Sequence, residues 1–127
     1  MNRFEIIGHL GDRPEIRNLN TGGQVANLRV AVNPTPYKDR DNGEWVNPPA
    51  DWFYVSVYLP ATVKWAEKKL TKGSQVRVQG SLRPRKFSDT HTGEDRWVMD
   101  LVVNNTRKGH EVVGLNLKPD EQAGDDE

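Results

Sequence analysis

A two-residue alternation runs through residues 51–59, Asp-Trp-Phe-Tyr-Val-Ser-Val-Tyr-Leu, and it restricts what the chain can fold into. Successive side chains of a β-strand point to opposite faces of its sheet. One face carries aromatic and small polar residues: Trp52, Tyr54, Ser56 and Tyr58. The other face is apolar throughout: Phe53, Val55 and Val57. The apolar face suits a core, so the aromatic face points outward, which is unusual in a protein without a ligand.

Alternation of the same kind predicts further strands at residues 4–10, 24–33, 74–82 and 96–103. The first of these contains Gly8 and is followed by Gly11, and both glycines are available for a bend or bulge. In the strand at 74–82 we expect inward side chains at Val76, Val78 and Leu82, and outward ones at Gln75, Arg77 and Gln79. This strand extends through Phe87 before a polar turn.

One helix is expected over about residues 61–70, because Pro60 fits the first turn of a helix. Its apolar side carries Val63, Ala66 and Leu70. The order is therefore three strands, a helix and two strands. This order predicts an all-β fold, a five-stranded OB-fold barrel with one helix between the third and fourth strands. A closed barrel also hides the edges of its strands.

Charge is distributed unevenly along the 127 residues, although the formal net charge is zero. Five acidic residues lie in the last eight positions, which leaves 18 basic against 13 acidic residues in residues 1–119. Such a balance suits a polyanion ligand, with ordinary surface charge as the alternative. We expect an OB-fold domain over residues 1–108 and a short, flexible acidic tail over 109–127. Within the tail, 112–117 could form a short strand or a docking segment, and 118–127 are expected to be disordered.

Several classes of protein do not fit the sequence. The chain has no cysteine, so it has neither disulfides nor thiolate metal sites. No apolar run approaches the roughly 20 residues of a membrane span. The N-terminus has no signal-peptide pattern. These features predict a cytoplasmic protein.

Catalytic patterns are also missing from the sequence. The three histidines, His9, His91 and His110, have no metal-ligand spacing. We find no phosphate-binding glycine loop and no serine-nucleophile elbow. Asp89 and Asp95 flank a turn, and turn chemistry explains them. We expect no enzymatic activity, no metal site and no cofactor.

Aromatic and basic residues occur together in three segments. The long loop at residues 34–50, which Asn42-Gly43 could close as a hairpin, is of a length that is usually functional or disordered. It carries Tyr37, Lys38, Arg40 and Trp45. The strand at 51–59 adds Trp52 and Tyr58, and the strand that follows the helix adds Arg83, Arg85, Lys86 and Phe87. Aromatic rings stack on any base, for roughly 1–3 kcal/mol each, and cations track phosphates, so this combination predicts single-stranded DNA binding without strong sequence preference.

Some aromatic residues have a structural alternative. Trp65 lies on the helix and is expected in the core. Trp97 is expected to pack against its strand neighbours. Trp52 could close one end of the barrel instead of binding DNA, and Tyr37 and Trp45 could pack on each other.

Six segments together resemble the bacterial single-stranded DNA-binding protein family, over about residues 3–104. The longest are Ile-Gly-His-Leu-Gly-Asp-Arg-Pro-Glu-Ile-Arg at 7–17 and Gly-Ser-Leu-Arg-Pro-Arg-Lys-Phe-Ser-Asp at 80–89. The others are Gly-Gly-Gln-Val-Ala-Asn-Leu at 22–28, Asp-Trp at 51–52, Leu-Thr-Lys-Gly-Ser-Gln-Val at 70–76 and Gly-Glu-Asp-Arg-Trp at 93–97. Each segment alone is a weak signal, but all six occur in the family's order and spacing.

The resemblance implies roles for individual residues. It implies base stacking by Trp52, Tyr58, Phe87 and Tyr37. It implies phosphate contacts by Arg3, Arg17, Lys72, Arg83, Arg85, Lys86 and Arg96. It also implies a homotetramer, with a dimer as the alternative. The family's hydrophobic tail tip is replaced by Ala-Gly-Asp-Asp-Glu at 123–127, so recruitment of replication and repair proteins is not inferred.

The sequence thus predicts sequence-independent binding and protection of single-stranded DNA during replication, recombination or repair. One rival is a primosomal or plasmid-encoded adaptor of the same fold, which would bind single strands and partner proteins. A second is an OB-fold that binds oligosaccharide or protein, and a third is an enzyme. The run Arg-Pro-Arg-Lys at 83–86 favours a phosphate-bearing ligand.

Overall fold

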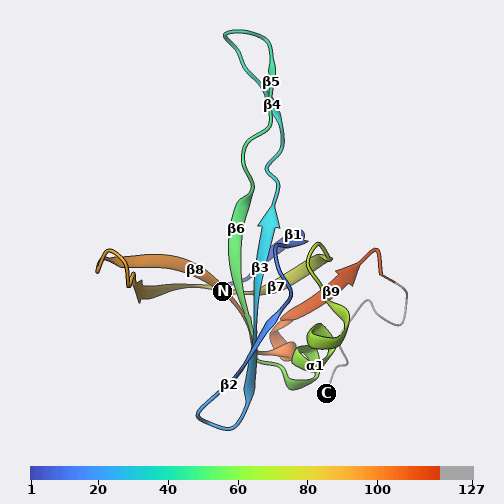
Figure 1. The fold of residues 1–127 in the computed structure, drawn as a ribbon. Helices are drawn as coiled ribbons and strands as arrows, with labels where there is room; N and C mark the ends of the chain where they lie inside the picture. Colours follow the sequence, from blue (N-terminus) through green and yellow to red (C-terminus); the bar gives the residue numbers. More distant parts are fainter. Residues whose placement is uncertain (118–127) are drawn as a thin grey trace.

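A closed ring of strands forms the centre of the computed structural model, which describes residues 1–117 (Figure 1). Its members are β1 (Phe4–Leu10), β3 (Gln24–Val32), β6 (Asp51–Val57), β7 (Gln75–Ser88) and β8 (Asp95–Val103). They follow one another in the order β1-β3-β6-β8-β7, and β7 pairs back onto β1. Neighbours are antiparallel except β6 and β8, which are parallel. The ring confirms the predicted all-β architecture.

Four shorter strands lie outside the ring: β2 (Glu15–Asn18), β4 (Tyr37–Lys38), β5 (Trp45–Val46) and β9 (Glu111–Leu115). β2 pairs with β3, β4 pairs with β5, and β9 pairs with β7. β9 is the short strand that the apolar residues near 112–117 allowed, whereas β2 was not predicted because its only apolar residue is Ile16. The domain boundary at residue 108 stays a prediction, and the expected disorder of 118–127 lies outside the described residues.

The helix α1 (Pro60–Lys69) follows β6, as predicted, with proline in its first turn. Its buried residues are Thr62, Val63, Trp65 and Ala66, which confirms the expectation that Trp65 belongs to the core. β6 ends at Val57, two residues earlier than expected, because Leu59 already serves as the N-cap of the helix. Within residues 1–117, no helix has the length and apolar character that crossing a membrane requires.

The core fills the inside of the ring and follows the alternation read from the sequence. Val55 and Val57 of β6 are fully buried, and Phe53 packs against the cluster with its ring centroid 5.8 Å from that of Phe4. At Gly8, a Cβ would collide with the carbonyl oxygen of Ala31. The close crossing of β1 and β3 therefore requires glycine there.

Gln79 departs from its predicted outward position, because it is buried. With its amide oriented to suit its neighbours, Gln79 donates to the Gly109 carbonyl (3.1 Å) and accepts from the Arg3 guanidinium. On the sheet, β1 and β9 flank β7 on its two sides. Gln79 is thus covered by the chain's N-terminal segment and by a residue just before β9, which no local pattern in 74–82 could indicate.

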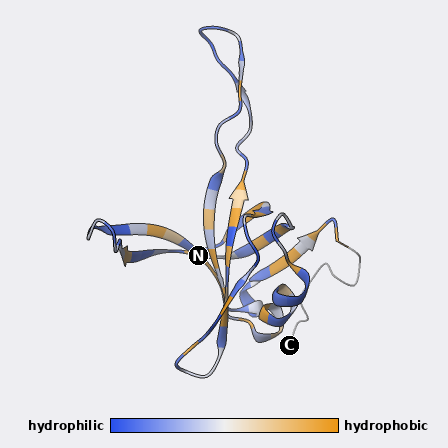
Figure 2. Ribbon diagram, viewed as in Figure 1, coloured by the Kyte–Doolittle hydropathy of each residue, from blue (hydrophilic) through white to orange (hydrophobic). Residues whose placement is uncertain are grey.

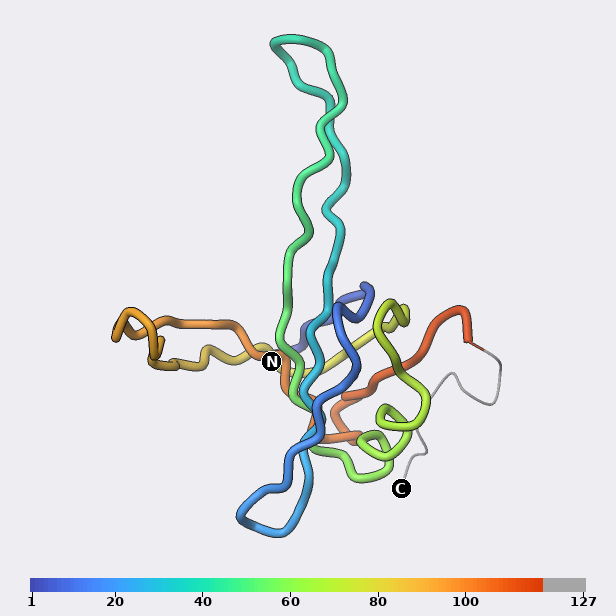
Figure 3. Tube along the Cα trace, in the orientation of Figure 1, coloured from blue at the N-terminus to red at the C-terminus, as the bar shows by residue number. Residues whose placement is uncertain are grey.

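Hairpins leave the ring in different directions: β2–β3, β4–β5 and β7–β8 (Figure 3). The long loop at 34–50 forms a hairpin, as Asn42-Gly43 suggested. Its turn is closed by a hydrogen bond from Asp39 N–H to the Glu44 carbonyl (2.8 Å), with Gly43 at φ 71°. Hydrophobic colouring is concentrated in the strands of the ring, and the β4–β5 arm is mostly hydrophilic (Figure 2).

Candidate nucleic-acid interface

The outward side of β3, β6 and β8 forms one continuous surface, which we call the outer face. Its residues are Asn27, Arg29, Trp52, Tyr54, Ser56 and Asp100. The strand register places Trp52 opposite Ala31, and Tyr54 opposite both Arg29 and Asp100. Trp52, Tyr54 and Tyr58 are each 40–48% exposed. The alternation in 51–59 therefore predicted the direction of these three rings correctly.

Trp52 lies on the outer face between two neighbours. The Arg29 guanidinium carbon is 4.6 Å from the centroid of its ring, within cation–π range. On the Gly11 side, a Cβ would come within 2.5 Å of the indole Cζ3. Because Trp52 is 48% exposed, it does not fill the inside of the ring, which argues against its use as a barrel plug. Its indole is held in place and still accessible.

A groove of about 850 Å³ lies over the outer face, and Arg29, the cation that contacts Trp52, is among its lining residues. Tyr54, Tyr58 and Arg29 line it, together with Arg85 from β7 and Arg17 from β2. Its described lining contains four acidic residues, Asp12, Glu15, Glu67 and Asp100, and four basic ones, Arg13, Arg17, Arg29 and Arg85. We call it the outer groove. Aromatic rings and guanidinium groups thus share one concave surface whose formal charge is balanced.

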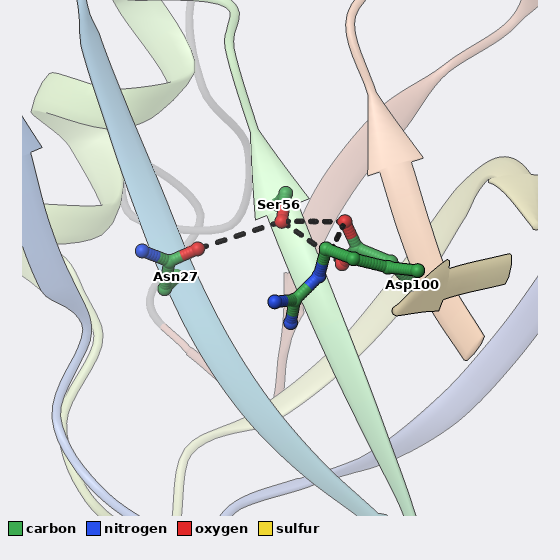
Figure 4. A network of polar contacts seen from close by, with 4 residues as sticks. Asn27, Ser56 and Asp100 are labelled. Carbon is green, nitrogen blue, oxygen red and sulfur yellow. Dashed lines mark hydrogen bonds and ion pairs between the residues drawn. The ribbon is translucent and has the colours of Figure 1, made fainter. Parts of the chain in front are cut away.

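A buried polar cluster fixes the floor of the outer groove (Figure 4). The Ser56 hydroxyl donates to the Asp100 carboxylate, with its oxygen 2.9 and 3.0 Å from the two carboxylate oxygens. Asn27 Oδ1 lies 3.4 Å from the same hydroxyl. Arg85 Nε is 3.8 Å from Asp100 Oδ2, and Asp100 is only 6% exposed. The buried carboxylate therefore holds Arg85 above the groove.

The β7–β8 hairpin has two different faces. Its register places Arg85 and Phe87 on the face that carries Asp100, so Phe87 extends the outer face. Lys86 lies on the opposite face, paired with Trp97; the Lys86 Nζ is 6.0 Å from the indole centroid and 3.1 Å from Asp95 Oδ2. The basic run at 83–86 is therefore divided between two faces.

Comparison with known proteins decides the class of this site. The model of the "Single-strand binding protein family" matches residues 1–110. The chain belongs to this family. It is thus a single-stranded DNA-binding protein with an OB-fold, and not an enzyme, as predicted.

A solved structure of similar fold is described as the Plasmodium falciparum SSB complex with ssDNA. The two chains are 30% identical, with a TM-score of 0.78. The alignment covers 91% of this chain and 96% of that one. The likeness therefore spans most of both chains rather than a single motif.

The β4–β5 arm carries the loop residues that were predicted to meet DNA. Tyr37 pairs with Val46 and Lys38 pairs with Trp45, so Tyr37 and Trp45 point to opposite faces. They do not pack on each other, which removes that alternative for two residues that are 55% and 70% exposed. Arg40 lies in the turn of the arm. Figure 1 places the arm well away from the ring.

Other predicted cations of this family member lie at different places. Arg17 lines the outer groove, with its Nε 2.7 Å from Glu15 Oε1. Arg96 Nε is 3.5 Å from Asp89 Oδ2. Arg3 and Arg83 line a second hollow, and Lys72 lies in the turn between α1 and β7. The structure thus brings only Arg17 and Arg85 of the predicted cations into the outer groove.

Two residues of the outer face, Tyr54 and Arg29, were not among the predicted DNA contacts. The alternation in 51–59 had placed Tyr54 on the outward side of its strand, but no prediction was made for Arg29. Trp97 was expected to pack against neighbours but is 66% exposed. It is exposed because β7 and β8 continue past the ring as a two-stranded hairpin, which has no core beneath it.

Metal chemistry finds no support in the described residues. Residues 1–117 contain no cluster of three His, Cys, Asp or Glu side chains arranged to hold a metal. Asp89 acts in its turn, where its Oδ1 accepts from the backbone N–H groups of His91 (2.8 Å) and Thr92 (3.3 Å). The turn interpretation of Asp89 is confirmed.

Proposed function

We propose that single-stranded DNA lies along the outer face, with its bases stacked on aromatic rings and its phosphates held by nearby guanidinium groups. The observation that supports this most is the shared surface of Trp52, Tyr54 and Tyr58 with Arg29 and Arg85. The rings are exposed, and their neighbours are cations. Stacking accepts every base, so such a surface binds without reading sequence.

Further contacts extend this proposal along the chain. Phe87 continues the stacking surface on the β7–β8 hairpin, and Tyr37 and Trp45 add rings on the β4–β5 arm. The proposed phosphate contacts are Arg3, Arg17, Lys38, Arg40, Lys72, Arg83, Arg85, Lys86 and Arg96. Contacts made by residues on the ring should contribute most to affinity. The strands already fix these side chains, so binding orders them at a lower entropic cost.

Assembly and cellular role belong to the same proposal. We propose a homotetramer, in which four OB-folds raise the effective concentration of weak contacts on one strand. A dimer is the alternative, and the mass in solution distinguishes them. The protein would protect single strands during replication, recombination or repair in the cytoplasm.

The test is a fluorescence titration of the full chain with oligo(dT) and with a duplex of equal length. Stacking on Trp52 changes the surroundings of its indole, so oligo(dT) should quench tryptophan emission. The duplex should bind far more weakly, because its bases are already stacked. The buried Trp65 provides a constant background. Equal affinity for duplex and single strand would refute binding by base stacking.

A further inference from the structure

A second hollow, of about 690 Å³, is lined by the N-terminal residues, by β7 and by the segment that precedes β9. Four cations line it: Arg3, Arg83, Arg107 and Lys108. Its described lining contains no carboxylate, in contrast to the four in the outer groove. No ion pair among residues 1–117 involves any of these four cations. The described lining of this hollow thus carries four basic side chains and no acidic one. We call it the cationic hollow.

A polar network builds this hollow from three distant parts of the chain. His110 Nδ1 accepts from the Asn104 N–H (3.2 Å), and its Nε2 lies 3.3 Å from the Ser81 hydroxyl. Ser81 donates to the Asn2 carbonyl (3.2 Å). The Asn2 side chain in turn pairs with both backbone groups of Leu82 (2.7 and 2.9 Å). Hydrogen bonds thus hold together the three chain segments that carry the four cations.

The charge of the hollow acts on His110, which is buried within that polar network. Burial lowers the pKa of His110, and Lys108 and Arg83 lower it further. His110 is therefore neutral, in agreement with Nδ1 accepting a hydrogen bond from Asn104. Since no carboxylate lines the hollow, a ligand with phosphate groups would relieve the mutual repulsion of its cations.

The hollow is close to the outer groove along β7. Arg85 lines the groove and Arg83 lines the hollow, and two residues of a strand span about 7 Å. We infer that the cationic hollow is a second phosphate-binding site, which receives the backbone of the single strand after it leaves the outer groove beside Arg85. This rests on the proposed function, and it adds Arg107 and Lys108 as DNA contacts.

The double variant Arg107→Ala/Lys108→Ala tests this inference. Neither side chain makes a hydrogen bond or ion pair within residues 1–117, so the fold should be kept. The matched control is Lys64→Ala/Lys68→Ala, which removes the same charge from exposed positions of α1 that line neither the groove nor the hollow. Circular dichroism and the melting temperature check both variants.

Affinity for oligo(dT) is measured against salt, with one oligonucleotide shorter and one much longer than the roughly 4–16 nucleotides of one OB-fold site. For the long oligonucleotide, the slope of log affinity against log salt should be shallower by about 1.4 in the Arg107/Lys108 variant, because each lost phosphate contact contributes roughly 0.7. For the short one, the slope should not change. The tryptophan quench should persist with both.

Two outcomes would overturn the inference: an unchanged slope with the long oligonucleotide, or an equal change in the Lys64/Lys68 control. A second readout is the ring-proton NMR shift of His110, which should move with the long oligonucleotide and not with the short one. A His110 signal that stays fixed also overturns the inference. Failure of the wild-type chain to bind either oligonucleotide would instead refute the proposed function.

Discussion

Trp52 and Trp45 are both exposed tryptophans beside a cation, but their surroundings differ. Trp52 lies between Arg29 and Gly11 on a sheet with a packed core beneath it. Trp45 stands on a two-stranded hairpin that projects from the ring (Figure 1). A fixed ring loses little conformational freedom when a base stacks on it, whereas a residue on an arm must be ordered by binding. The two tryptophans have the same side chain, but Trp52 should thus contribute more to DNA affinity than Trp45.

The largest expected effect is that of Trp52→Ala. The substitution should cost roughly 1–3 kcal/mol of binding free energy per stacked base and remove much of the tryptophan quench. The melting temperature should change little, because the ring is half exposed. Fluorescence titration with oligo(dT) measures the first effect and calorimetry the second. A sharp fall in stability with unchanged DNA affinity would show that Trp52 has a structural role.

The next effect concerns the support beneath the outer groove. Asp100→Ala leaves the Ser56 hydroxyl with only its longer contact to Asn27 Oδ1 and frees Arg85, so the free energy of unfolding should fall by about 1–3 kcal/mol. Arg85→Ala should lower stability less than Asp100→Ala, because Asp100 keeps its hydrogen bond from Ser56, and should flatten the salt slope by roughly 0.7. Urea denaturation measures the change in stability, and salt titration of DNA binding measures the change in slope. If Arg85→Ala leaves the slope unaltered, Arg85 does not contact phosphate.

Trp45→Ala on the arm sharpens the comparison directly. We expect a loss of affinity below the roughly 1–3 kcal/mol of a fixed stacking ring, and no change in the melting temperature. The matched variant is Trp97→Ala, which removes another exposed indole, from the β7–β8 face opposite Phe87. If Trp45→Ala costs as much affinity as Trp52→Ala, then holding the ring in place before binding does not increase its contribution to affinity.

The smallest effect concerns His110 and pH. Its pKa is lowered in the folded chain, so the unfolded chain binds the extra proton more readily. The stability associated with neutral His110 is complete above the unfolded pKa of about 6.5 and is lost as the pH falls through the folded value. His110→Gln should weaken this acid-side decline in the melting temperature. An identical pH profile in the variant would show that other groups cause it.

Local sequence accounts for most of the ring. The alternation in 51–59 determined which side of β6 faces the core and which rings face outward, because a strand's side chains alternate whatever surrounds it. The helix after Pro60 and the hairpin at Asn42-Gly43 were likewise predicted from local signals. β2 was missed because four residues with one apolar side chain leave no pattern.

What the sequence could not decide is which side chains meet. Alternation suggested that Gln79 is exposed, yet Arg3 and Gly109 cover it from distant parts of the chain. Trp97 was predicted to pack against its strand neighbours, yet it is exposed because the hairpin that carries it has no core. The run at 83–86 reads as one basic cluster, but the sheet turns Arg85 toward the groove and Lys86 away from it, and Arg83 lines the hollow. The sequence alone determined the strands and the supply of rings and cations, since these follow from local periodicity and composition. Only the closed ring decided which of them share a surface, because that depends on pairing between strands far apart in the chain.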